Sequence, residues 1–159
     1  VVMVDVADTR LDLALKMGAK AGVNPMKTDV DAFLRDTHGD ASGPLPGADT
    51  DIYIDTAGVS SVIDASIKNA KFNARLVLFG IHKKPLTIDA ISVVSKQITL
   101  YSSCGYDAEE WRPTIDLVES GKFNIAPIVT HNFKLSETLA ALQMSTRGNE
   151  ALKVVVLPD

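Results

Sequence analysis

Short apolar runs alternate with amphipathic stretches along the whole chain. Residues 1–4 form a continuous apolar run, which predicts a strand buried on both faces, as in a parallel sheet. Asp5 closes this run, and Asp8 or Thr9 is expected to cap a helix that ends at Gly18. Further strands are predicted in the first two thirds of the chain, at residues 21–24, 52–55, 76–79 and 98–102.

Helices are expected between these strands, because apolar side chains spaced three and four residues apart share one helix face. The clearest such pattern begins near Ser60 and turns Ile63 and Ile67 inward. A more polar helix is expected at residues 28–35 and a short one at residues 89–95. Strands that alternate with helices of about ten residues predict a doubly wound, parallel α/β sheet with right-handed crossovers.

The last third of the chain predicts two more helices. The first covers residues 109–120 and carries Trp111 on its apolar stripe. The second is expected to be capped by Ser136, with Leu139 and Leu142 on its apolar side. The remaining predicted segments are a surface loop at residues 36–49 and extended stretches at residues 128–133 and 154–157.

The composition narrows the class of protein. The chain has 159 residues, of which 46% are hydrophobic and 23% charged, an ordinary balance for a compact domain. Its formal charge is −4 at pH 7 and its Lys and Arg residues are scattered, so no nucleic-acid partner is expected. No stretch approaches the roughly 20 apolar residues that span a bilayer, so no membrane segment is expected.

Two features bear on where the protein works. Cys104 is the single cysteine, which excludes an internal disulfide and a cysteine-rich zinc site within the chain and favours the cytoplasm. Residues 1–5 lack the basic region and cleavage pattern of a signal peptide. Because the chain starts directly on a predicted buried strand, we expect it to begin inside a longer protein.

The carboxyl ends of the strands are the expected binding positions, because doubly wound sheets bind ligands there. An acid after the second strand of a dinucleotide fold accepts hydrogen bonds from the adenosine ribose and repels a 2'-phosphate. Asp5 has this position if residues 1–4 are that second strand. From the strand alone, Asp5 is more simply explained as a turn residue and Arg10 as a solvated helix residue.

Four segments, in a common order and spacing, carry a resemblance to a known family. Residues 1–14 with the following Met-Gly-Ala look like a second strand and helix with an "LGA" close, and residues 51–58, DIYIDTAG, are similar to "DVVFEATG". Residues 75–81, RLVLFGI, resemble "RVVLVGL", and residues 127–133, PIVTHNF, resemble "PLITHRF". Together they resemble the zinc-dependent alcohol and polyol dehydrogenases of the medium-chain dehydrogenase/reductase superfamily.

The resemblance implies contacts with NAD along the chain. Asp5 would bind the adenosine ribose, with Arg10 beside it and Val6 against the adenine. Lys153 would lie near the pyrophosphate, although a solvated cation at a strand start explains it equally well. The residues implied at the nicotinamide ribose and ring are Thr56, Ala57, Gly58, Phe79, Gly80, Ile81, Ser103 and Gly105.

The resemblance also implies that part of the enzyme lies outside these residues. Catalytic residues, zinc ligands, the first strand and the glycine-rich phosphate loop would all be outside this chain, which alone is expected to be inactive. The fold is thus predicted to be an incomplete Rossmann-like sheet, with residues 1–104 forming part of the NAD-binding domain. Residues 105–159 would complete the catalytic, GroES-like domain. Residues 1–4 and 52–55 would flank the absent strand, so direct pairing between them would contradict the assignment.

The histidines and the cysteine are given structural roles. His38 and His82 are expected at the surface, and the resemblance implies a structural role for His131. Three dispersed histidines do not predict a metal site. Cys104 is expected to be a small packed residue rather than a nucleophile. The turn at residues 72–74, Phe-Asn-Ala, departs from the Gly-Gly of the family and leaves its conformation open.

Three functions are compatible with these residues. The first is hydride transfer between a secondary alcohol or polyol and NAD, with zinc polarising the alcohol oxygen. The second is a zinc-free quinone or enoyl reductase, a class that usually prefers NADP, against which Asp5 argues. The third is a non-catalytic dinucleotide-binding module. A small-molecule alcohol is the expected partner, and the edge strand near residues 97–102 is expected to form a homo-oligomer.

Overall fold

A computed structural model describes all of residues 1–159 and divides them into two compact units. The terminal unit consists of Val1–Thr28 and Tyr106–Asp159, and the middle unit consists of Asp29–Gly105. Every pairing between named strands in the two units is parallel, which confirms the predicted α/β class. No helix has both the length and the apolar composition needed to cross a bilayer.

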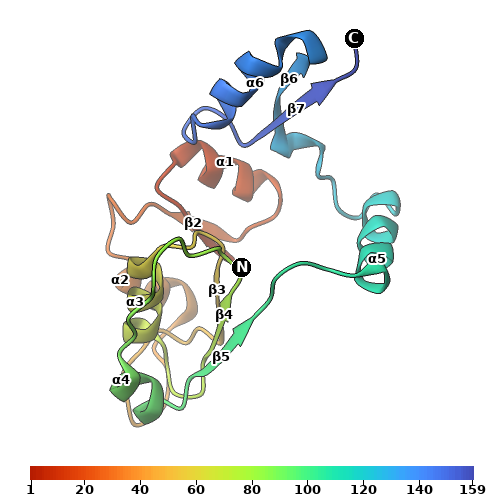
Figure 1. The fold of residues 1–159 in the computed structure, drawn as a ribbon. Coiled ribbons are helices and arrows are strands. Elements are labelled where there is room, and N and C mark those ends of the chain that lie inside the picture. The colour runs from red at the N-terminus through yellow and green to blue at the C-terminus, as the bar shows by residue number, and fades with distance from the viewer. The chain divides into compact units, whose positions relative to one another are not determined.

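The terminal unit begins with a βαβ element. Strands β1 (Val2–Val4) and β2 (Ala21–Val23) pair in parallel, and α1 (Asp8–Lys16) connects them (Figure 1). Leu11 of α1 is buried and lies so close to Gly22 of β2 that a Cβ on this glycine would be 3.3 Å from the Cβ of Leu11. Gly18 follows the helix with a φ of 102°, which confirms the predicted left-handed stop.

Two expectations for this element are wrong. The N-cap of α1 is Ala7 rather than Asp8 or Thr9, because the Asp5 carboxylate already accepts a hydrogen bond from the Ala7 amide. The predicted burial of residues 1–4 also fails, since Met3 is 40% exposed and Val4 45% exposed. A parallel strand is buried only where helices cover both faces of its sheet, and β1 lacks that cover within this chain.

The rest of the terminal unit is mainly helical, with one strand pair. Asp107 and Glu110 form a capping box at the start of α5 (Ala108–Glu119). Figure 1 shows α6 beside the parallel strands β6 and β7. The remaining elements follow in the order η1 (Ala126–Ile128), β6 (Val129–Lys134), η2 (Leu135–Glu137), α6 (Thr138–Ser145) and β7 (Lys153–Leu157).

The predicted cap and apolar side of α6 are wrong. Ser136 lies inside the preceding 3₁₀ turn, and the helix begins only at Thr138. Leu139 is 70% exposed and Leu142 is 60% exposed, whereas Ala141 is 3% exposed. The phase of a short helix is fixed by the residue that fits its packing partner, and here that residue is the small Ala141.

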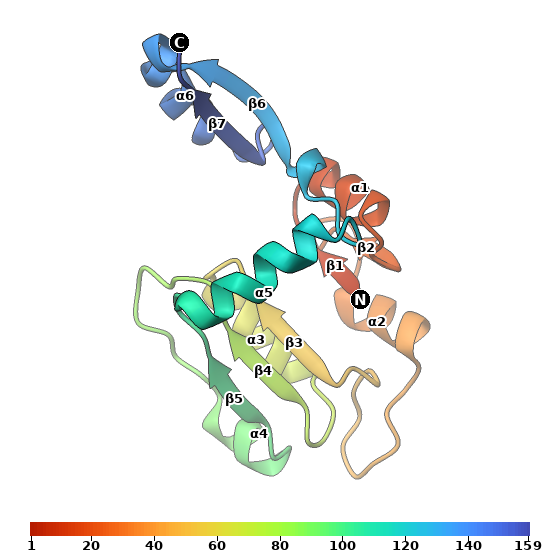
Figure 2. The same cartoon turned by 90° about the vertical axis from the view of Figure 1, so that its right-hand side faces the viewer.

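The middle unit contains a three-stranded parallel sheet in the order β3–β4–β5. Figure 2 shows these strands side by side, with α3 behind them. β3 pairs with β4 alone and β1 with β2 alone, so the pairing that would contradict the strand assignment is not formed. The elements of this unit are α2 (Val30–His38), β3 (Ile52–Asp55), α3 (Ser60–Asn69), β4 (Arg75–Leu78), α4 (Ala90–Ser95) and β5 (Thr99–Ser102).

The core of the middle unit lies on one face of this sheet. Ile63 and Ile67 of α3 pack with Leu76 of β4 and with Ile98, as the helical spacing predicted. Residues 76–79 form a continuous apolar run, which is typical of a buried strand, but Phe79 is 55% exposed. The run is therefore buried only at its start, because the helices of this unit cover one face and not the strand ends.

The turn before β4 adopts a left-handed conformation without glycine. Asn73 has a φ of 61°, a conformation that asparagine tolerates better than most residues. Its amide donates to the carbonyl oxygen of Lys96 at 2.8 Å. The departure from Gly-Gly in this turn therefore retains the backbone geometry that glycine would provide.

Lys96 closes the C-terminal end of α3. This residue is 9% exposed, and its Nζ donates to the carbonyl oxygens of Ile67 at 3.0 Å and Lys68 at 2.5 Å. Helix C-termini have carbonyl groups without partners in the helix, and the ammonium satisfies two of them. Burial of the side chain lowers the pKa of Lys96 from its ordinary value of 10.5.

We predict that Lys96→Met lowers the free energy of unfolding by about 1–3 kcal/mol, because two carbonyl oxygens at the end of α3 lose their donor. Urea unfolding at neutral pH measures this change.

The lowered pKa of Lys96 means that the folded chain releases this proton at a lower pH than the unfolded chain does. The free energy of unfolding of the natural protein should therefore rise between that pKa and 10.5. The rise should be absent in Lys96→Met and unchanged in the exposed control Lys84→Met, and a rise equal in all three proteins would contradict the assignment.

Candidate functional site

Asp5 follows β1 and has a defined set of partners. One carboxylate oxygen accepts from the Ala7 amide at 2.8 Å, and the other lies 3.5 Å from Nη1 of Arg10. Nη2 of Arg10 donates to the carbonyl oxygen of Gly148 at 2.8 Å, which anchors the guanidinium on the loop before β7. The Asp5 side chain remains 23% exposed, so the acid is both a turn residue and accessible to a ligand.

The other predicted residues of the terminal unit lie at the surface. Val6 is 59% exposed directly after Asp5. Lys153 begins β7, where its side chain is exposed. No hydrogen bond or ion pair joins Lys153 to Asp5 or Arg10, so the structure brings Asp5, Val6 and Arg10 together without adding Lys153 to them.

In the middle unit, the segments that follow β3 and β4 touch through two glycines. Gly58 has a φ of 66°, and a Cβ there would lie 2.5 Å from the carbonyl oxygen of Ile81. A Cβ on Gly80 would overlap the backbone nitrogen of Gly58. The structure thus brings the predicted segments 56–58 and 79–81 into direct backbone contact, which only glycine permits at both positions.

The third strand ends at the same edge of this sheet. The Ser103 amide donates to the carbonyl oxygen of Leu78 at 3.2 Å, which shows that β5 ends level with β4. Gly105 has a φ of 77°, and both Ser103 and Gly105 are exposed. All eight residues predicted at the nicotinamide end therefore lie at or near the carboxyl ends of β3, β4 and β5.

Asp55 is a residue that the sequence interpretation left out of the site. Its side chain is 0% exposed, and its carboxylate accepts from the amides of Ala57 at 3.0 Å and Gly58 at 3.1 Å. Its backbone oxygen accepts from the amides of Phe79 at 3.0 Å and Gly80 at 2.7 Å. An acid that closes an apolar strand just before a glycine turn was the sequence signal for this role.

His82 corrects a second expectation. It was expected at the surface, yet its side chain is 16% exposed and its Nε2 lies 2.9 Å from the Asp55 carboxylate. The partners are 27 residues apart, and no local pattern indicates such a contact. The expected packing of Cys104 is also wrong, because this cysteine is exposed.

The remaining histidines do not form a metal site. Nδ1 of His38 lies 2.7 Å from Oγ1 of Thr50, and His131 stacks on Phe133 with ring centroids 6.5 Å apart. Nowhere in residues 1–159 do three or more His, Cys, Asp or Glu side chains gather in a way that could hold a metal ion. The chain therefore does not fit a zinc ion with its own residues.

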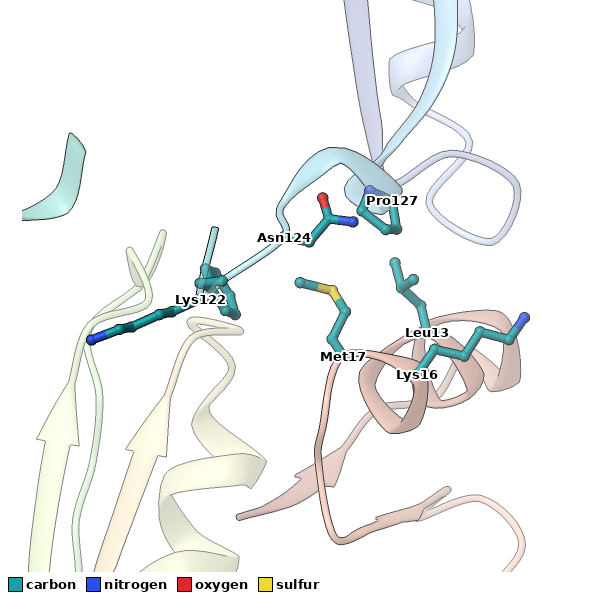
Figure 3. A pocket seen from close by; sticks show the side chains of 7 residues that line it. Leu13, Lys16, Met17, Lys122, Asn124 and Pro127 are labelled. Atoms are coloured by element: carbon teal, nitrogen blue, oxygen red, sulfur yellow. The ribbon is translucent and has the colours of Figure 1, made fainter. Parts of the chain in front are cut away.

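A hollow of about 280 Å³ lies between α1 and residues 122–127, and none of its lining residues belongs to the predicted site (Figure 3). Its wall is mainly apolar, and Figure 3 shows Leu13 of α1 and Met17, which follows the helix, facing Asn124 and Pro127. The remaining lining residues are Lys16, Lys122 and Phe123. It contains no carboxylate, histidine or thiol, and its only ionisable side chains are those of the two lysines.

Comparisons with known proteins agree with this architecture. Sorbitol dehydrogenase 1 of Saccharomyces cerevisiae is 27% identical over 157 residues, which cover 98% of this chain and 44% of the relative. L-threonine 3-dehydrogenase of Vibrio cholerae is 31% identical over 138 residues, which cover 86% of this chain and 38% of the relative. The chain thus spans less than half the length of these curated relatives.

A solved structure shares the fold. The short chain alcohol dehydrogenase rspB of Escherichia coli CFT073, complexed with the cofactor NADH, aligns with a TM-score of 0.79 at 23% identity. The alignment covers 96% of this chain and 43% of that one. The family model described as zinc-binding dehydrogenase matches residues 1–120, three quarters of the sequence. The chain belongs to the zinc-binding dehydrogenase family.

Proposed function

We propose that the protein carrying these residues transfers a hydride between a secondary alcohol or polyol and NAD. The observation that carries this proposal is the accessible carboxylate of Asp5 at the end of β1, held by the Ala7 amide and beside Arg10. The relatives named sorbitol and threonine dehydrogenase support the substrate class.

Asp5 would select NAD through charge and hydrogen bonding. Its carboxylate can accept both hydroxyl hydrogens of the adenosine ribose, whereas the 2'-phosphate of NADP would be repelled at this distance. Arg10 is anchored on the Gly148 carbonyl and lies 3.5 Å from the Asp5 carboxylate, so it would orient that carboxylate. Val6 would offer its exposed apolar surface to the adenine ring.

In the middle unit, the residues at the carboxyl ends of β3, β4 and β5 would bind the nicotinamide end of NAD. Thr56, Ala57 and Gly58 would line the ribose there. Phe79, Gly80, Ile81, Ser103 and Gly105 would present backbone groups to the nicotinamide. The exposure of Phe79 at 55% and of Ile81 at 81% supports this assignment, because apolar side chains at strand ends are available to a ring. Lys153 would act near the pyrophosphate through its positive charge.

Zinc, where the whole protein uses it, would be held by residues outside these 159, because no side-chain cluster here fits a metal ion. Zinc bound there would polarise the alcohol oxygen. Residues 1–104 would then belong to the NAD-binding domain and residues 105–159 to the catalytic domain. We also infer a reducing compartment, the cytoplasm, from the free and exposed thiol of Cys104.

We further propose a dimer through β5. This strand pairs only with β4, and Leu100 is 38% exposed and Tyr101 52% exposed on it. An unpaired edge of this kind is a template for pairing with a second strand. A two-fold axis at this edge would join the sheets of two copies.

We predict that Asp5→Ser weakens NAD binding by roughly tenfold or more, because charge-assisted hydrogen bonds to the ribose are lost. NADP binding should strengthen relative to NAD, because the repelling charge is gone. Titration of both cofactors into the protein at its natural length measures the ratio. Asp12→Ser removes an equal charge from the exposed side of α1 and should leave the ratio unchanged.

The cofactor proposal is wrong if the natural protein binds neither dinucleotide. It is also wrong if Asp5→Ser and Asp12→Ser give the same ratio of NAD to NADP affinity. Binding of NAD by the natural protein without turnover of any secondary alcohol or polyol would favour the non-catalytic module instead.

We predict that Leu100→Pro converts the dimer to a monomer. Amide groups alternate along a strand, and those of Thr99 and Ser103 point to β4, so the Leu100 amide points to the open edge. Proline removes that donor without disturbing the pairing with β4, whereas Leu100→Ala retains it and should remain dimeric. Light scattering after size-exclusion chromatography measures the mass, and a natural protein that is monomeric at all concentrations would refute the dimer.

A further inference from the structure

One buried carboxylate joins the ends of two strands in the middle unit. Asp55 is the last residue of β3, and its two carboxylate oxygens together accept from Ala57, Gly58 and His82. Its carbonyl oxygen accepts from Phe79 and Gly80, the residues just after β4. A single residue therefore fixes the segments that follow both strands.

His82 supplies the one side-chain donor to this carboxylate. Without it, the second carboxylate oxygen would keep only the Gly58 amide, which is 3.3 Å away. A carboxyl group with no exposed surface requires several hydrogen-bond partners, because burial without them is strongly unfavourable. The imidazole thus supplies one of these partners and ties residues 80–82 to the end of β3.

The hydrogen bond between His82 and Asp55 also restrains the backbone contact between segments 56–58 and 79–81. The carbonyl of Ile81 passes directly over Gly58, and Gly80 leaves no space for a side chain at the Gly58 nitrogen. A shift of residues 80–82 would therefore move Gly58 as well. Backbone groups that bind a ligand must be held in place before it arrives, since ordering them on binding lowers the affinity.

We propose that Asp55 and His82 are positioning residues for the nicotinamide half of the cofactor. Asp55 has no exposed side-chain surface and His82 little, so both would act through the backbone segments that they hold. Asp55 holds segment 56–58, and His82 holds segment 79–82 against it through the carboxylate. This inference rests on the proposed NAD-dependent function, and it assigns to His82 a role in cofactor binding beyond simple packing.

The experiment separates the two halves of the cofactor with two ligands. AMP carries only the adenosine end, whereas NADH carries both ends and reports on its ring by fluorescence. We expect His82→Phe, in the protein at its natural length, to weaken NADH binding about tenfold and to leave AMP binding unchanged. His82→Gln can still donate to Asp55 and should recover NADH binding to within about threefold of the natural protein.

His38→Phe is the matched control. His38 is also a partly buried, hydrogen-bonded histidine of the middle unit, but its partner is Thr50, before β3 begins. This control should lose stability without changing either affinity. Should His82→Phe fail to fold, His82→Ser leaves the space open and carries the same expectation for NADH and AMP.

Equal weakening of AMP and NADH by His82→Phe would overturn the proposal, because that result indicates a general loss of structure. Unchanged NADH binding in both His82→Phe and His82→Ser would overturn it too. A His82→Gln protein as impaired as His82→Phe would show that the hydrogen bond to Asp55 is not the cause. A natural protein that binds neither AMP nor NADH would instead refute the proposed function itself.

Discussion

The buried carboxylate of Asp55 is the interaction on which the middle unit depends at the carboxyl ends of its strands. Three parallel strands end together there, and the backbone amides of the segments that follow them need acceptors. Asp55 satisfies four of these amides, two through its side chain and two through its carbonyl oxygen. Gly58 and Gly80 let the two backbone segments come into contact. The hydrogen bonds to Asp55 hold the segments in that contact.

The same sheet also explains where the structure is exposed. Parallel strands bury their side chains fully when helices lie on both faces. In the middle unit, α3 packs against one face, where Ile63, Ile67 and Leu76 are buried, whereas Ile54 on the other face is 64% exposed. The continuous apolar runs that predict strands therefore report the strand positions correctly but overstate burial within this chain.

Sequence patterns predicted the elements well, because strand and helix periodicities depend on local spacing alone. The helix at Ser60 and its inward Ile63 and Ile67 follow from a spacing of four residues. The cap of α1 and the phase of α6 did not follow, because each depends on a partner outside the helix. Asp5 takes the Ala7 amide in one case, and packing selects Ala141 in the other.

The candidate site likewise has residues that the sequence predicted and a contact that it did not predict. The residues at strand ends could be identified from the order of the motifs, whereas the contact between Asp55 and His82 spans 27 residues and depends on two strands ending side by side. Asp5 would recognise its ligand by the charge of one side chain, so a single substitution there can alter cofactor preference. The edge formed by Gly58 and Gly80 would recognise its ligand through backbone shape. Variation at that edge is therefore limited to side chains that point outward, such as those of Phe79 and Ile81.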